Sequence, residues 1–164
     1  RLGHGDTSTQ YLPKRVEALD THVVREVSAG AHHSGCVTAE GHLYLWGWST
    51  DGKLGEERKE NALSPFRIRS LDGRVVKGVS CGYHHTLVLT VDGEVFSCGK
   101  NNFGQLGAAN VLSSTSLLAV ERLDGVCVTE VSAGDAHSLC ASDEGEVFAW
   151  GRGQDGRLGL ASDD

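Results

Sequence analysis

Short runs of hydrophobic and β-branched residues, separated by turns that contain glycine, recur along the chain with a constant period of 52 residues. The segments 24–55, 76–107 and 128–159 align without a gap, and 10 of their 32 columns are identical in all three copies. Five of those identical columns hold glycine, which is typical of turns. A period of this length indicates a repeat architecture, in which each unit buries its hydrophobic side chains against the next.

Each unit is predicted to form four short antiparallel strands. In the second unit these are Val75–Ser80, Thr86–Val91, Glu94–Cys98 and Leu117–Leu123, and the last one matches Phe66–Leu71 and Lys14–Leu19 in the other copies. Hairpin turns are predicted at Glu40-Gly41, Asp92-Gly93 and Glu144-Gly145. Strand interiors such as Leu87–Leu89 are apolar at successive positions, as expected for a sheet that lies between two others. The predicted fold class is therefore all-β, with β-propeller blades that are four-stranded antiparallel sheets.

The residues that recur indicate the type of blade. They read V-S-A/C-G-x-x-H-S/T, then E/D-G-x-L/V-Y/F-x-W/C-G, then x-G-x-L-G, and Leu2–Asp6 has the form of a repeat junction. In these motifs the chain resembles the regulator of chromosome condensation (RCC1) repeat family. WD40 blades are shorter, at about 40–45 residues, and kelch blades would bring a recurrent Gly-Gly pair.

The resemblance implies a propeller of about seven blades, of which this chain would supply about three. The repeats run approximately over 4–55, 56–107 and 108–159, with 1–3 as the tail of a preceding repeat. Because three blades cannot close a ring, we expect a partial propeller with two open blade faces. We expect the remaining propeller blades, or self-association, to cover those faces.

Composition excludes several classes of partner. The chain has 15 Lys and Arg against 22 Asp and Glu, a net charge of −7, and its cations are scattered, which argues against nucleic acid as a partner of this segment. No apolar run approaches the ~18 residues needed to span a bilayer, so we expect no membrane partner. The 5 cysteines form no C-x-x-C pair and are expected to be buried free thiols. Such thiols favour an intracellular location, cytoplasmic or nuclear.

No nucleophile elbow, P-loop or H-E-x-x-H motif is present, so the sequence predicts no catalytic residue, no metal site and no cofactor. The histidine that recurs once per unit could suggest a metal ligand. A polar residue at the same place in every blade more often makes a repeated structural hydrogen bond, and that is our expectation. The predicted structural positions are His33, His85 and His137, the turn glycines Gly30, Gly82 and Gly134, and the strand-ending glycines Gly47, Gly99 and Gly151.

The candidates for partner binding are loop residues that differ between units while the recurring motif residues around them stay the same. Propeller loops gather on the rims, where a partner can reach them. They follow the turn glycine or the strand-ending glycine: Trp48, Tyr83, His84, Lys100, Asp135 and Arg152. The alternative is that these are ordinary rim residues. We predict a non-catalytic protein–protein interaction module. The founding member of the family that the chain resembles exchanges nucleotide on the GTPase Ran, which leaves guanine-nucleotide exchange on a small Ran-like GTPase as the alternative function.

Overall fold

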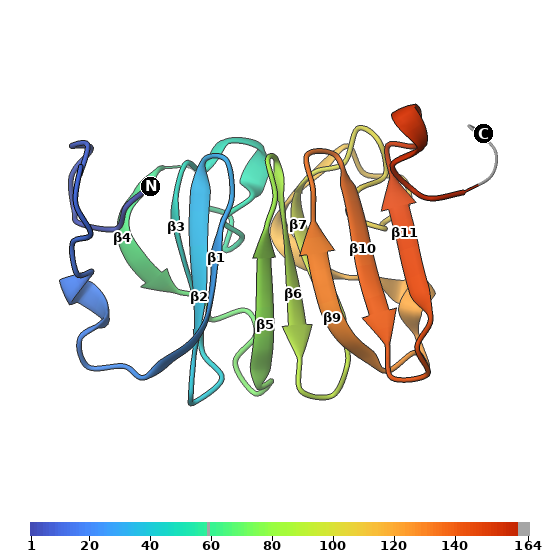
Figure 1. Cartoon of the computed structure of the whole chain (residues 1–164), viewed down its shortest axis with the longest axis horizontal. Coiled ribbons are helices and arrows are strands. Elements are labelled where there is room, and N and C mark those ends of the chain that lie inside the picture. Colours follow the sequence, from blue (N-terminus) through green and yellow to red (C-terminus); the bar gives the residue numbers. More distant parts are fainter. Residues whose placement is uncertain (59, 161–164) are drawn as a thin grey trace.

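The computed structural model describes residues 1–58 and 60–160. Three antiparallel sheets stand side by side as blades (Figure 1), with strand orders β1-β2-β3-β4, β5-β6-β7-β8 and β9-β10-β11. The strands are β1 Val24–Ala29, β2 His33–Thr38, β3 Leu43–Gly47, β4 Ala62–Arg67, β5 Val76–Cys81, β6 His85–Thr90, β7 Val95–Lys100, β8 Ser113–Ala119, β9 Val128–Ala133, β10 His137–Ser142 and β11 Val147–Gly151. Single 3-10 turns lie in the connections: η1 Glu17–Leu19, η2 Thr50–Gly52, η3 Glu121–Leu123 and η4 Gln154–Gly156. The predicted all-β blade architecture is confirmed.

The first three strands of the second unit lie within two residues of their predicted bounds. The predicted hairpin turns are also present, and their glycines take the left-handed conformation that favours glycine. The φ angles are 78° at Gly41, 81° at Gly93 and 84° at Gly145. The repeating glycines therefore set the strand register in each blade.

The fourth strand is displaced from its prediction. β4 and β8 end at Arg67 and Ala119, four residues before the predicted ends. The apolar residues that suggested a strand are three apart, Ile68 with Leu71, and their counterparts Val120 and Leu123 stand at the same spacing. That spacing suits one helical turn. The four side chains are buried, and they belong to the turn that follows each strand rather than to the strand itself. The predicted strand at Lys14–Leu19 is absent, because the described residues offer it no third-strand neighbour.

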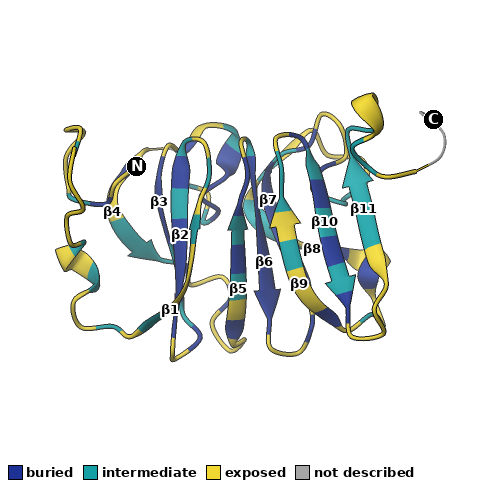
Figure 2. Ribbon diagram, viewed as in Figure 1, coloured by how far each residue is buried: buried dark blue, intermediate teal, exposed yellow. Residues whose placement is uncertain are grey.

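The core lies between the blades. Every residue of β6, the inner strand of the middle blade, is buried (Figure 2), because blades pack on both of its faces. In β10 buried and half-buried residues alternate, since only one face of that sheet is covered within the described chain. Val27 on the first blade and Val147 on the third are 73% and 71% exposed. The open blade faces expected from three repeats are thus present at both ends.

All five cysteines are free, as predicted, but only four are buried. Burial raises the pKa of Cys81 and of Cys98 to about 12 and that of Cys36 to about 11. Cys127 is exposed on the connection before β9, so the expectation that all five are buried is wrong at this position. Among the described residues, no helix has the length and hydrophobicity needed to cross a membrane.

Candidate functional site

The repeated motif V-S-A/C-G-x-x-H-S/T joins neighbouring blades. The Ser28 hydroxyl oxygen of the first blade accepts the N–H of Cys81 in the second at 2.9 Å. The Ser80 hydroxyl oxygen of the second blade accepts the N–H of Ala133 in the third at 2.8 Å. The same side chain therefore makes the same contact at both blade interfaces.

The recurring histidine bridges the same interfaces. The Nε2 atom of His33 lies 2.7 Å from the Thr86 hydroxyl oxygen, and that hydroxyl donates to the Lys53 carbonyl at 2.6 Å. Because a hydroxyl has one proton, Thr86 accepts from His33, which places the imidazole proton on Nε2. His85 and Ser138 repeat the arrangement at 2.9 Å. The predicted structural role of these two histidines thus has a defined geometry.

Both bridging histidines are fully buried. Burial lowers the pKa of His33 to about 3, with a further contribution from the positive charge of Lys53. Burial also lowers the pKa of His85 to about 4. Both rings are neutral at physiological pH, and in both Nδ1 has no hydrogen-bond partner among the described residues. His137 has the same place in the third blade but is half-buried, because no further described blade covers it.

The turn glycines allow these interfaces to close. A Cβ atom on Gly30 would lie 2.4 Å from the Gly82 carbonyl oxygen, and one on Gly82 would lie 2.5 Å from the carbonyl oxygen of Gly134. The N–H groups of Ala31 and Tyr83 donate across the interfaces to those same carbonyls. Close approach of backbones explains the turn glycines. The strand-ending glycines are explained by conformation, because Gly47, Gly99 and Gly151 have φ between 106° and 113°, which side chains disfavour.

The candidate residues that follow the turn glycines and those that follow the strand-ending glycines lie on the same rim, the upper edge of the blades in Figure 1. In each blade, the residue after the strand-ending glycine donates its N–H to a carbonyl in the turn before the recurring histidine. Trp48 donates to His32 at 2.9 Å, Lys100 to His84 at 3.0 Å and Arg152 to Ala136 at 2.8 Å. The backbone of this rim is therefore constant, and only the side chains vary between blades.

An aromatic cluster, defined by Trp48, His32, Tyr83 and His84, occupies the rim where the first and second blades meet. The His32 ring makes edge contacts with Trp48 and with Tyr83, at centroid distances of 4.8 and 5.0 Å, and Tyr83 lies 4.5 Å from His84. The His84 Nδ1 is 3.0 Å from Asp51 Oδ2. Burial and the charges of Arg1 and Lys53 lower the pKa of His32. Three of the six predicted residues are thus brought together.

The other three predicted residues lie outside this cluster. Lys100 is the last residue of β7, and its N–H donates to the His84 carbonyl. Asp135 is exposed on the turn between β9 and β10. The Arg152 guanidinium lies 5.0 Å from the centre of the Phe103 ring and bonds to Gln154, so the structure does not join it to Trp48. Sequence reasoning missed Lys53, whose Nζ lies 5.2 Å from the centre of the Trp48 ring. Its signal is the variable residue between glycine and leucine in x-G-x-L-G.

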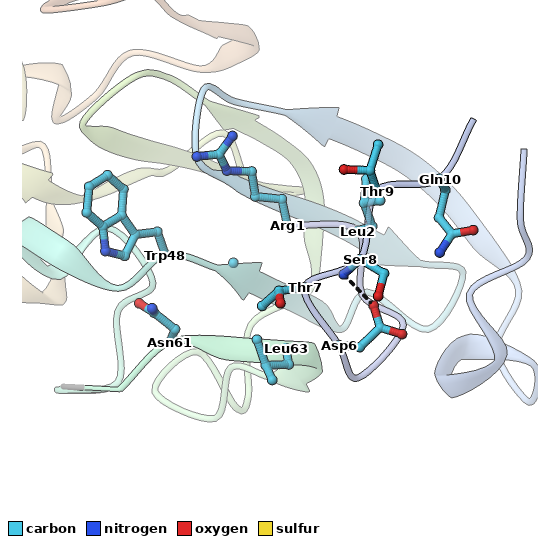
Figure 3. Close-up of a pocket in the computed structure, with 11 residues that line it drawn as sticks. Arg1, Leu2, Asp6, Thr7, Ser8, Thr9, Gln10, Trp48, Asn61 and Leu63 are labelled. Atoms are coloured by element: carbon cyan, nitrogen blue, oxygen red, sulfur yellow. Dashed lines mark hydrogen bonds between the residues drawn. The ribbon is translucent and has the colours of Figure 1, made fainter. Parts of the chain in front are cut away.

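An open groove of about 600 Å³ continues the rim beside Trp48. Trp48 stands at one end and Gln10 at the other, between the segment Asp6–Gln10 and the start of β4 (Figure 3). The walls combine apolar side chains, Leu2 and Leu63, with neutral polar ones such as Asn61 and with the charged residues Arg1 and Asp6. Within the described ranges, no group of three His, Cys, Asp or Glu side chains could hold a metal ion.

Comparison with known proteins agrees with the geometry of the blades. The family model of the regulator of chromosome condensation (RCC1) repeat matches residues 1–37, 40–89 and 92–141. A second model with the same description matches residues 76–105 and 128–157.

The chain is 35% identical over 161 residues to the ultraviolet-B receptor UVR8 of Arabidopsis thaliana, which covers 98% of the chain and 37% of the receptor. It is 39% identical over 163 residues to the human probable E3 ubiquitin-protein ligase HERC6, which covers 98% of the chain and 16% of the ligase. The chain thus spans well under half of these relatives.

Solved structures show the same fold. Yeast RCC1 (Prp20), in its complex with Kap60, has a TM-score of 0.77 at 23% identity, over 86% of this chain and 35% of that one. Human WBSCR16 has a TM-score of 0.73 at 27% identity, over 78% of this chain and 33% of that one.

Proposed function

Because this chain belongs to the RCC1 repeat family, we propose that it is a non-catalytic interaction module that binds another protein through one propeller rim. The observation that carries this proposal is the aromatic cluster. Trp48 and Tyr83 are 43% and 42% exposed, although both are held by ring contacts with His32. Large aromatic side chains that are exposed and already ordered lose little entropy on binding, and they often dominate protein interfaces.

The constant backbone of the rim also favours recognition. Each blade fixes its rim residues by the same backbone hydrogen bond, from Trp48, Lys100 or Arg152 to the facing turn. Side chains can then differ between blades without a change in the scaffold. This is the arrangement expected of a binding surface built on repeats.

Neither ligase activity nor nucleotide exchange is assigned to these residues. The chain covers only 16% of HERC6, so the activity of that ligase concerns mostly other residues. The likeness to yeast RCC1, at 23% identity, concerns the fold. Exchange on a small GTPase therefore rests on family resemblance, and it is tested alongside binding.

The test is quantitative affinity capture from an extract of cells that make the protein. Wild-type chain, Trp48→Ala, Tyr83→Ala and the control Tyr11→Ala are compared, because Tyr11 is 93% exposed and lies outside the rim. We expect a partner whose affinity falls by about 1–3 kcal/mol with each rim variant and is unchanged by the control. Equal capture by all four proteins would refute the proposal. Faster GDP release from a captured GTPase would favour the exchange alternative.

A further inference from the structure

Lys53 is buried in an unusual way. Its residue surface is only 1% exposed, and it is the largest of the fully buried side chains. Among the described residues, its ammonium group has no ion pair and no hydrogen bond, and its one defined contact is with the Trp48 ring at 5.2 Å. Lys53 Nζ is not among the fully buried nitrogens that lack a hydrogen bond, so the ammonium group keeps contact with solvent at the rim while the rest of the side chain is buried.

One carboxylate and one further lysine lie near Lys53. Burial lowers the pKa of Lys53, the negative charge of Asp51 raises it, and the positive charge of Lys100 lowers it by a smaller amount. The carboxylate of Asp51, however, is already bonded to His84 at 3.0 Å. Lys53 and Lys100 thus share one neighbouring carboxylate, which already has a partner, at the junction of the first two blades.

The second unit shows that the fold does not require this charge. Gln105 has the place of Lys53 there, is also 1% exposed, and its Oε1 accepts the N–H of Phe103 at 3.0 Å. The backbone carbonyls of both residues accept the same interface hydroxyls, from Thr86 and Ser138. A neutral side chain with its hydrogen bond satisfied therefore fills the position, and the ammonium group of Lys53 is an addition to the scaffold.

We propose that Lys53, with Lys100 beside it, forms a carboxylate-binding subsite that receives a glutamate or aspartate side chain of the partner protein. This inference rests on the proposed rim interaction and specifies its chemistry. A carboxylate would supply the charge-assisted hydrogen bond that Lys53 lacks, and such bonds are stronger where water is excluded. The exposed rings of Trp48 and Tyr83 would cover the aliphatic part of the incoming side chain.

A capped tetraglutamate peptide provides a defined probe. Trp48 is observed by ¹⁹F NMR after incorporation of 5-fluorotryptophan, and its signal is identified among the 3 tryptophans with Trp48→Phe. We expect a saturable shift of the Trp48 signal with tetraglutamate and none with capped tetraglutamine. Lys53→Gln, which reproduces the side chain of the second unit, should weaken tetraglutamate binding about tenfold or more.

The control is Lys14→Gln, which changes the net charge equally but lies on the exposed amino-terminal segment. It should leave the affinity unchanged within about twofold. Thermal melting should show Lys53→Gln to be as stable as wild type or more so, since the variant removes a partly buried charge.

The inference is overturned if tetraglutamate produces no shift, if Lys53→Gln binds it as well as wild type, or if inorganic phosphate produces the same saturable shift. Those results would leave the proposed function standing as long as Trp48→Ala still loses the captured partner. Loss of the proposed function would instead appear as capture that is insensitive to Trp48→Ala and Tyr83→Ala.

Discussion

Replacement of His85 by alanine tests the interface between the second and third blades. The ring of His85 is fully buried, and its Nε2 donates to the Ser138 hydroxyl at 2.9 Å. The substitution removes this hydrogen bond, worth about 1 kcal/mol, and leaves a cavity where the ring packed. We expect the free energy of unfolding to fall by about 2–4 kcal/mol at pH 7.5.

The size of this loss should depend on pH. Burial lowers the pKa of His85 to about 4, against 6.5 for the unfolded chain. Below pH 6.5 the unfolded state therefore takes up a proton that the folded state does not, and stability is lost as the pH falls toward the folded pKa. From pH 7.5 to 5 this costs the wild type about 2 kcal/mol through His85, at 1.36 kcal/mol per pH unit. His85→Ala cannot incur that cost, so its deficit should shrink by about 2 kcal/mol at pH 5.

The assay is urea unfolding followed by tryptophan fluorescence at pH 7.5 and 5.0. His137→Ala serves as the control, because it removes the same residue from a half-buried site. We expect it to cost less than half as much at pH 7.5. His33 contributes equally to wild type and to both variants, so its titration cancels in the comparison.

A deficit of His85→Ala that is the same at both pH values would refute the claim that His85 is held neutral by burial. Unchanged stability together with lost partner binding would show that His85 belongs to the binding surface rather than to the scaffold.

Three further outcomes are expected. Thiol titration should find one fast group in the native chain, Cys127, and all 5 cysteines after denaturation without reductant; fewer after denaturation would indicate a disulfide. Gly82→Ala should lower the free energy of unfolding by about 1–3 kcal/mol, because the new Cβ atom would lie 2.5 Å from a carbonyl oxygen. The control Gly153→Ala should change it little, because the nearest atom to its Cβ would be 3.5 Å away. Equal melting temperatures of the two variants would contradict this. The isolated chain should associate head to tail, so that the third blade of one copy packs against the first blade of the next. His137 of one copy would then lie beside Ser34 of the other, as His85 lies beside Ser138 within the chain. A monodisperse monomer in sedimentation would refute this association.

The inner strands could be predicted because the hairpin glycines define their ends. Gly41, Gly93 and Gly145 must take positive φ angles, and each therefore reports a turn by its identity alone. The outer strand gives no such signal. Ser113–Ser116 at the start of β8 has the composition of a loop, and it becomes a strand only because β7 offers it a backbone edge.

The rim could be predicted in part for a similar reason. Trp48 and Tyr83 stand out as residues that vary next to invariant glycines, and the structure places them on either side of His32. Arg152 satisfied the same criterion but belongs to the third blade, where it contacts Phe103. Alignment of repeats identifies equivalent positions, but it does not say which blades lie close enough for their side chains to meet.

Lys53 shows why the remaining residue was missed and why it matters. Its carbonyl oxygen belongs to the interface between blades, where it accepts from Thr86, and that role needs no particular side chain. Its ammonium group instead lies beneath Trp48 on the rim. One residue thus serves the fold through its backbone and is free to serve recognition through its side chain. The same division holds at Trp48 and Lys100, whose N–H groups make the repeated hydrogen bonds while their side chains differ. A scaffold that depends on backbone groups at its rim can change partners by substitution without loss of the fold.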